Sequence, residues 1–260
     1  MNPVVAALSV GAMEHGTQSS AFLLFAEDKL QLIALTFMTV VYIAKIRWIL
    51  TFTAGKERQA PTGNPGTSAK RGGTYSLFNI FMPWSMASTR QHPLFYLQFG
   101  IFHVGVASAI AMSLVVPYLP GLIAAPYIVV ALQVLFAAAC LIGLGRFLRR
   151  VLSPYMRAIS TPDDYFAVAL LTVWFAFACM AAPNNHAETE FWILGFFLLT
   201  AFFLAYVPFS KISHYIFYPF TRWYLGKTLG RRGVYPMKLS WQEVTRDFLR
   251  PNPFMPGKDK

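Results

Sequence analysis

Long apolar runs, separated by short polar segments, dominate the chain. A helix rises 1.5 Å per residue, so about 20 apolar residues cross a hydrocarbon core roughly 30 Å thick. Five runs meet this length, and they lie near 30–52, 93–118, 122–146, 165–183 and 191–218. The pattern predicts an all-α, polytopic membrane protein, a bundle of five transmembrane helices, whose membrane domain spans 30–218.

The polar segments predict three further regions. Residues 1–29 lack the basic start of a signal peptide, and we expect them to form an external tail. A loop over 53–92 contains APTGNPGTSAKRGG, whose Pro, Gly and Ser content cannot build a core. It is either a partner-binding loop or a flexible linker. The basic, aromatic tail over 219–260 is suited to anionic lipid or to another subunit.

Composition narrows the class of protein. Of 260 residues, 56% are hydrophobic and 13% are charged, whereas soluble domains average about 45–50% and about 25%. A soluble globular protein is therefore excluded. The two cysteines, Cys140 and Cys179, are too few for an iron–sulfur cluster or a structural zinc, which take about four ligands. Any cluster chemistry must belong to a partner chain.

The net charge of +11 raises the question of nucleic acid, which would need a basic face on a soluble domain. The basic residues instead lie in the gaps between the apolar runs, as in membrane proteins that follow the positive-inside rule. In the five-helix arrangement, 21 of the 22 Lys and Arg fall on one side, and only Lys29 on the other. We therefore expect an external N-terminus, a cytoplasmic C-terminus and no nucleic-acid partner.

Histidines are the main candidates for chemistry within the membrane, where ionisable side chains are costly. His15 and His186 fall in predicted external segments, and His92 immediately precedes the second apolar run. Only His103 and His214 lie well inside predicted spans, both in the cytoplasmic half, so one cofactor between two helices could reach both.

Haem is the cofactor that this pair would suit, because neutral imidazole is an axial ligand of haem iron. Gly100 and Gly105 flank His103, and their missing side chains would let a flat macrocycle approach the helix. Spacing alone leaves a second interpretation open, in which His103 and His214 form hydrogen bonds between helices.

Three segments resemble the gamma subunit of respiratory nitrate reductases and the related membrane cytochromes b of heterodisulfide reductase and dissimilatory sulfite-reductase-linked complexes. They are IFHVG around His103, FLRRVLSPYMRAISTPDDYFAVALL, and VPFSKISHYIFYP around His214. The resemblance covers roughly residues 93 to 225. It implies a prokaryotic inner-membrane subunit in which His103 and His214 ligate the b-haem nearer the cytoplasm. This haem would carry electrons between the quinone pool and a cytoplasmic iron–sulfur subunit.

One departure from that family concerns the number of haems. Two-haem members carry a second histidine pair, and the matching positions here are about Ser113 and Phe196. No histidine occurs over 104–185 or 187–213, so the sequence predicts one haem b. We then expect either that the quinone binds within the bilayer close to this haem, toward its cytoplasmic half, or that another subunit supplies a second cofactor. The alternative function is a haemless membrane scaffold or small transporter in which the two histidines only bridge helices.

Basic and acidic residues between the third and fourth runs have two interpretations each. Arg149, Arg150 and Arg157, together with Arg146, are topology determinants that contact lipid phosphates. One or two could also pair with haem propionates through a planar guanidinium. The segment Thr161–Asp164 contains adjacent carboxylates, but its hydroxyl, proline and acids favour a helix cap over a catalytic pair.

Overall fold

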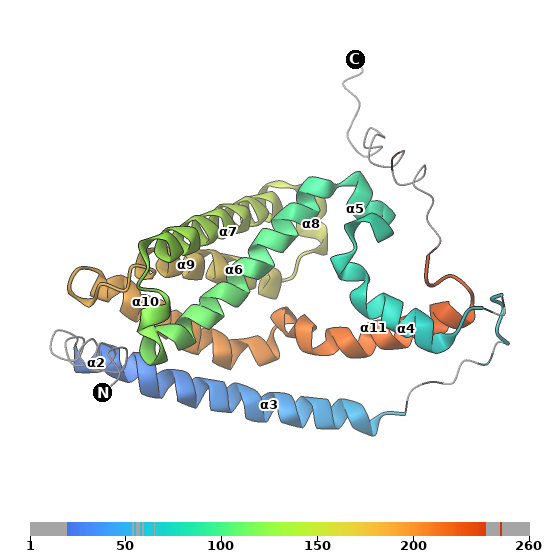
Figure 1. Ribbon diagram of the computed structural model, residues 1–260, viewed down its shortest axis with the longest axis horizontal. Helices are drawn as coiled ribbons and strands as arrows, with labels where there is room; N and C mark the ends of the chain where they lie inside the picture. The colour runs from blue at the N-terminus through green and yellow to red at the C-terminus, as the bar shows by residue number, and fades with distance from the viewer. Residues whose placement is uncertain are drawn as a thin grey trace, which may run out of the picture. The chain divides into compact units, whose positions relative to one another are not determined.

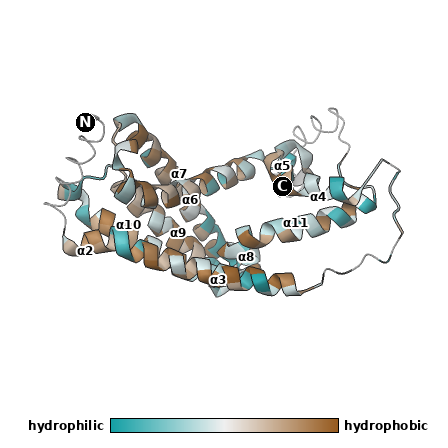
Figure 2. Cartoon of the chain, turned by 60° about the horizontal axis from the view of Figure 1, so that its bottom comes forward, coloured by the Kyte–Doolittle hydropathy of each residue, from teal (hydrophilic) through white to brown (hydrophobic). Residues whose placement is uncertain are grey.

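The computed structural model describes residues 20–53, 55, 58, 60–64, 66–237 and 245, and in these ranges it is helical with no strand (Figure 1). Within these described ranges, five helices are long and apolar enough to cross a membrane: Ala21–Thr51, Pro93–Tyr118 (α6), Pro126–Leu152 (α7), Pro162–Ala181 (α9) and His186–Phe209. Apolar residues run along the length of these helices (Figure 2). The prediction of an all-α protein with five such helices is confirmed, and the orientation of the termini stays a prediction.

The chain divides into two compact units. The first comprises Met1–Ile49 and Gly100–Ser213, and the second Leu50–Phe99 and His214–Lys260. Each unit is described by itself below.

The core of the first unit lies around α9, which packs against α7 on one side and against α10 (His186–Tyr206) on the other. Trp174 and Phe175 of α9 are almost fully buried. The Trp174 indole nitrogen donates to Thr200 Oγ1 of α10 at 2.8 Å, and the Phe175 ring meets Phe102 of α6 edge to face, 5.2 Å between centroids. Large aromatic side chains therefore join α6, α9 and α10 through specific contacts.

The first transmembrane helix begins nine residues before its predicted start at residue 30. It consists of α2 (Ala21–Leu24), the π-helical segment η1 (Phe25–Leu30) and α3 (Gln31–Thr51). Ser20 caps it, its hydroxyl accepting a hydrogen bond from the Leu23 amide at 3.2 Å. The charged triplet over 27–29, which we expected in the external tail, is inside this helix. Residues 1–19 of the predicted external tail lie outside the described residues.

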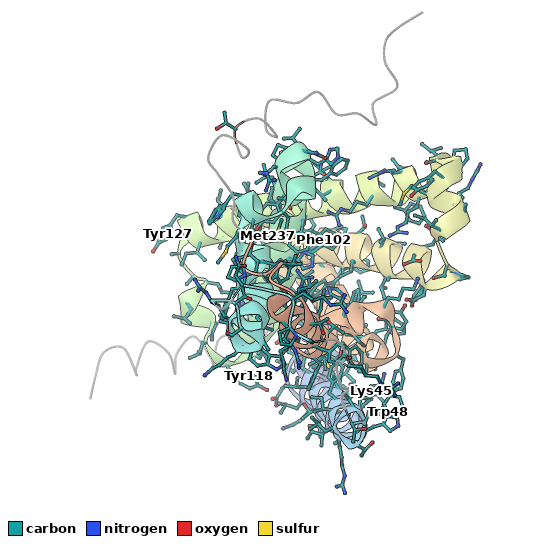
Figure 3. All side chains as sticks on the ribbon, turned by 90° about the vertical axis from the view of Figure 1, so that its right-hand side faces the viewer. Lys45, Trp48, Phe102, Tyr118, Tyr127 and Met237 are labelled. Atoms are coloured by element: carbon teal, nitrogen blue, oxygen red, sulfur yellow. The ribbon has the colours of Figure 1, made fainter. Side chains whose placement is uncertain are left out.

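Basic and aromatic side chains lie near the C-terminal end of α3. Lys45 lies over the ring of Phe209, 5.1 Å from its centroid, and Trp48 is exposed (Figure 3). An amphipathic aromatic at the end of an apolar helix suits a membrane–water boundary.

The fifth apolar run does not form one helix to residue 218 as predicted. Helix α10 ends at Tyr206 and is followed by the 3-10 turns Val207–Phe209 (η5) and Lys211–Ser213 (η6). Pro208 is the physical reason, because its ring clashes with the preceding turn and it has no amide hydrogen to donate. The hydroxyls of Ser210 and Ser213 donate to the Val207 carbonyl, at 3.2 and 2.6 Å.

The second unit is built on two helices that pack closely, α4 (Ala69–Phe78) and α11 (His214–Arg231). A Cβ on Gly72 of α4 would lie 2.4 Å from the Gly226 carbonyl oxygen and 2.5 Å from the Gly230 Cα, so only glycine permits this approach. Arg222 of α11 donates to Asn79 Oδ1 at 2.7 Å, next to the interface.

Shorter helices complete this unit: η2 (Asn79–Phe81), η3 (Pro83–Ser85) and α5 (Ala87–Gln91). Part of the predicted loop over 53–92 is therefore helical, because its glycines pack against α11. Of the predicted tail over 219–260, the part up to Arg231 belongs to α11. Residues 238–244 and 246–260 of this tail lie outside the described residues.

Candidate functional site

His103 lies on α6, in the first unit, on the side of the helix that its neighbours leave uncovered. Phe102 and Gly105 are buried, and they turn toward α7 and α9. His103 itself is exposed, with its ring 6.3 Å from that of Phe102. The helix thus presents an accessible imidazole within an apolar span, as an axial ligand requires.

The two glycines that flank His103 have different surroundings. A Cβ on Gly105 would lie 2.9 Å from Ala139 Cβ and 3.2 Å from the ring of Phe175. The absence of a side chain at Gly105 therefore lets α7 and α9 pack close to α6. Around Gly100, apart from its chain neighbours and the adjacent backbone of its own helix, no atom of the described residues lies within 4 Å of an added Cβ. The approach of a flat cofactor to the backbone is therefore open at Gly100. At Gly105 the structure shows helix packing, and a role in cofactor binding stays a prediction.

His214 is the first residue of α11, in the second unit, and it is exposed. It follows the break after α10, so it lies at a helix start and not inside the fifth apolar helix, where we had placed it. The side chain of Ser213 turns back to Val207 and so fixes the chain immediately before the histidine. The imidazole is accessible at the start of a helix that begins where the membrane-crossing helix has ended.

Helix α7 ends at Leu152, almost two turns after its predicted end at residue 146, and two of the arginines lie in this extension. Arg149 and Arg150 occupy the last turn of α7, where cations complement the helix dipole. Arg150 donates to Ser160 Oγ at 2.8 Å, and Arg157 of α8 (Pro154–Ile159) donates to the Val151 carbonyl at 3.4 Å. These contacts stabilise the turn between α7 and α9. Pairing of Arg149, Arg150 or Arg157 with a propionate stays a prediction.

Arg146, one turn before this group, also contacts the neighbourhood of His103. Its guanidinium lies over the Phe102 ring, 5.4 Å from the centroid, as in a cation–π interaction. Phe102 therefore contacts the basic end of α7, and it is the residue next to the candidate ligand on α6.

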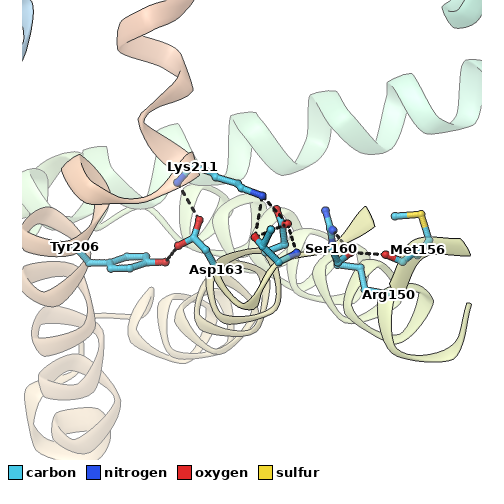
Figure 4. Close-up of polar contacts among 8 residues, drawn as sticks. Arg150, Met156, Ser160, Asp163, Tyr206 and Lys211 are labelled. Atoms are coloured by element: carbon cyan, nitrogen blue, oxygen red, sulfur yellow. Dashed lines mark hydrogen bonds and ion pairs between the residues drawn. The ribbon is translucent and has the colours of Figure 1, made fainter. Parts of the chain in front are cut away.

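The acidic segment at the start of α9 caps the helix, as predicted. Thr161 and Asp164 form a capping box, in which Asp164 Oδ2 accepts from the Thr161 amide at 2.8 Å. Lys211 pairs with the same carboxylate oxygen at 2.7 Å, and its amide donates to Asp163 Oδ2 at 3.0 Å. Asp163 also accepts from the Tyr206 hydroxyl (Figure 4). Both carboxylates thus join the start of α9 to the break after α10.

Sequence reasoning missed a buried polar group at the opposite end of the same unit. His186, which we expected in an external segment, is the first residue of α10 and is 6% exposed. Its Nε2 lies 3.6 Å from Oε1 of Glu27 in η1. Gln31, one turn after Glu27, is also buried. The spacing of Glu27 and Gln31 by four residues, directly before the long apolar run, is the signal that could have indicated a shared buried face.

Other candidates lie apart from these groups. His92 lies between α5 and α6, with its ring 5.9 Å from Phe95. Cys140 and Cys179 are unpaired thiols in the interior helices. Within the part of the chain that the structure describes, no three His, Cys, Asp or Glu side chains gather as a metal site would need. A cofactor ligated by two histidines does not need such a group.

Comparisons with known proteins find a distant relative. A protein of Nitratidesulfovibrio vulgaris strain Hildenborough, described only as "Protein", is 25% identical over 195 aligned positions, which cover 71% of this chain and 80% of the relative. No family model matches the chain. No solved structure matches it either. The resemblance to the membrane cytochromes b stays a prediction.

Proposed function

We propose that this chain is the haem b-containing membrane anchor of a quinone-linked respiratory oxidoreductase in the prokaryotic inner membrane. It would transfer electrons between the quinone pool and a cytoplasmic iron–sulfur subunit. The observation that carries the proposal is the exposed imidazole of His103 on a helix of membrane-crossing length and apolar composition. An ionisable side chain at such a position is costly in lipid and is typical of a functional site.

Two observations on the individual residues support the proposal of a bis-histidine haem. His103 and His214 are both exposed, so each imidazole is accessible to an iron ion, and the space beside Gly100 is open. When bound, the haem supplies a one-electron carrier. The chain's own part is to hold the iron through His103 and His214, and to neutralise propionates with Arg149, Arg150 or Arg157. The apolar helices would exclude water from the haem.

Partners follow from the same proposal. The two cysteines of the chain cannot hold an iron–sulfur cluster, so the next electron carrier belongs to another subunit. The basic residues of α4 and α11, among them Lys70, Arg71, Lys227 and Arg231, would contact that subunit or anionic lipid. Quinone would bind in the bilayer near the haem as the exchangeable substrate.

The rival function is a haemless scaffold or small transporter, in which His103 and His214 serve only the packing of helices. A reduced-minus-oxidised visible spectrum of the purified full-length chain separates the two. The haem proposal expects the absorption bands of a six-coordinate b-type cytochrome. A colourless preparation from cells that make haem in excess would refute it and leave the scaffold.

A further inference from the structure

Three buried polar side chains gather where η1 packs against the first turns of α10. Glu27 is 5% exposed, Gln31 is 3% exposed and His186 is 6% exposed. All three belong to the first unit and lie within helices of membrane-crossing length. A carboxyl group and an imidazole in such a place are expensive to bury, and groups of this kind are commonly functional.

Glu27 Oε1 lies beside His186, and Gln31 is held against α10 by its own hydrogen bonds. Glu27 Oε1 lies 3.6 Å from His186 Nε2, and the same nitrogen lies 3.1 Å from Asn184 Oδ1. The Gln31 amide nitrogen donates to the Phe197 carbonyl at 2.7 Å and to the Ala26 carbonyl at 3.3 Å. These two bonds hold the Gln31 side chain in a single orientation.

Two oxygens of the group are buried acceptors. Among the described residues, neither Glu27 Oε1 nor Gln31 Oε1 has a hydrogen-bond partner. A carboxylate without a donor is strongly destabilised in an apolar interior, whereas a protonated carboxyl or a protonated imidazole beside it removes that cost. The site is therefore built to hold a proton between Glu27 and His186.

The backbone on both sides of the pair departs from regular helix. Glu27 lies in the six-residue π-helical segment η1, and π-helical turns inside α-helices frequently occur at functional sites. Across from it, Asn184 has a φ of 52°, and Thr189 interrupts the helical dihedrals of α10. Non-glycine residues adopt positive φ at a cost that surrounding contacts must offset.

The other titratable groups on these elements have partners of their own or face water. Asp28 accepts from the Tyr118 hydroxyl at 3.0 Å and pairs with Lys29 at 3.1 Å. Glu190 accepts from the Ser20 amide at 3.3 Å, and Glu188 is exposed in the first turn of α10. Among the acids of η1 and α10, Glu27 is the one buried beside an imidazole. Asn185 and Glu188, next to His186, are exposed, so water reaches the end of this helix.

We propose that Glu27 and His186 form a membrane-embedded proton-binding site that exchanges one proton with water at the start of α10. In the neutral pair the ring hydrogen of His186 is on Nδ1, so Nε2 has a lone pair for the proton. The O–H bond of the Glu27 carboxyl breaks as a bond forms between that proton and His186 Nε2, and the new N–H can donate to Asn184 Oδ1. This step converts a neutral pair into a carboxylate and an imidazolium. The imidazolium then gives the proton to water, and loading reverses both steps without any oxidation or reduction. The site is separate from the proposed haem ligands.

Infrared spectroscopy of the full chain in lipid tests the proposal, because the C=O stretch of a protonated carboxyl absorbs apart from carboxylates and amides. A pH-difference spectrum of the wild-type chain should contain one such band that shifts in heavy water. Glu27→Gln should abolish it, whereas the matched control Glu188→Gln, on the exposed side of α10, should leave it. A band that survives Glu27→Gln, or that disappears in Glu188→Gln, would overturn the proposal.

A second variant keeps the test decisive if Glu27→Gln does not fold. In His186→Gln no imidazolium can stabilise the Glu27 carboxylate, so the carboxyl band should persist to higher pH. We expect its midpoint to rise by about one pH unit, a tenfold change in proton affinity. An unchanged midpoint would show that Glu27 titrates without His186 and would refute the pair. Neither result depends on haem, so failure here is distinguishable from failure of the proposed cytochrome.

Discussion

The surroundings of the candidate histidines divide their imidazoles into two kinds. His103 and His214 are exposed, so a ligand can reach them. His186 is buried beside a carboxyl group, so its ring serves the interior of the chain. The residue type is the same in each case, and accessibility decides which chemistry each ring can take part in.

The first prediction concerns the axial ligands. Replacing His103 or His214 by Ala removes one iron bond that no other histidine can supply, so each variant should lose stable haem incorporation. The measurement is the b-type spectrum per milligram of purified protein. His15→Ala is the matched control and should retain the wild-type spectrum.

His186→Ala provides a sharper control for the same experiment. It should leave the haem bands in place while removing the partner of Glu27, so its expected effect is on protonation and not on colour. Retention of the full spectrum in His214→Ala would contradict the assignment of that ligand.

Sequence reasoning identified the candidate ligands but not the buried polar group. His103 and His214 stand out because they are isolated histidines in apolar runs, which any hydropathy pattern reveals. We expected Glu27 in the external tail, because a charged triplet ordinarily marks the end of a transmembrane helix. Its burial depends on His186, which is 159 positions away, and only tertiary packing brings the two together.

At the scale of elements, the acids at the start of α9 are structural. Asp164→Ala removes the capping box and the ion pair with Lys211, which should lower the free energy of unfolding by about 1 kcal/mol. Thermal unfolding followed by circular dichroism measures this change. Electron transfer should be unaffected once the protein is folded; a selective loss of activity at unchanged stability would instead favour a catalytic carboxylate.

A second prediction at this scale tests the contact between α4 and α11. An added Cβ on Gly72 would meet backbone atoms at 2.4 and 2.5 Å, which cannot move aside as a flexible side chain can. Gly72→Ala should therefore destabilise the second unit by about 1–3 kcal/mol. The measurement is protection of the α4 and α11 amides in hydrogen exchange.

Gly145→Ala on α7 is the matched control for this variant. It is also a helical glycine, and apart from its chain neighbours and the adjacent backbone of its own helix, no atom of the described residues lies within 4 Å of the added Cβ. Alanine should be tolerated there and should stabilise the helix by up to about 1 kcal/mol. Equal behaviour of the two variants would show that the glycines of α4 are not required for close packing.

At the scale of the whole molecule, the first prediction concerns the side of the membrane on which the C-terminus lies. The charge distribution predicts a cytoplasmic C-terminus, because Lys and Arg are retained on that side. A C-terminal fusion to a phosphatase active only outside the cytoplasm should be inactive, and a fusion to a protein fluorescent only in the cytoplasm should be bright. The reverse pair of results would invert the topology and place both candidate ligands toward the outer side of the membrane.

The number of haems is the second prediction at this scale. Two accessible histidines permit one bis-imidazole haem, and positions Ser113 and Phe196 hold no further ligands; both side chains are buried in the first unit. A pyridine haemochrome assay against protein concentration should give a ratio near one. A ratio near two would require ligands other than His103 and His214, with His92 the first to test.

The sequence by itself determined the class of protein, the number of transmembrane helices and the capping of α9. Each of these depends on local information: the length of an apolar run, or a hydroxyl, a proline and an acid within four residues. Tertiary structure alone decided how α4 packs on α11 and that Glu27 faces His186. Both features depend on atoms far apart in the chain, whose contacts offset the cost of a close backbone approach or of a buried charge.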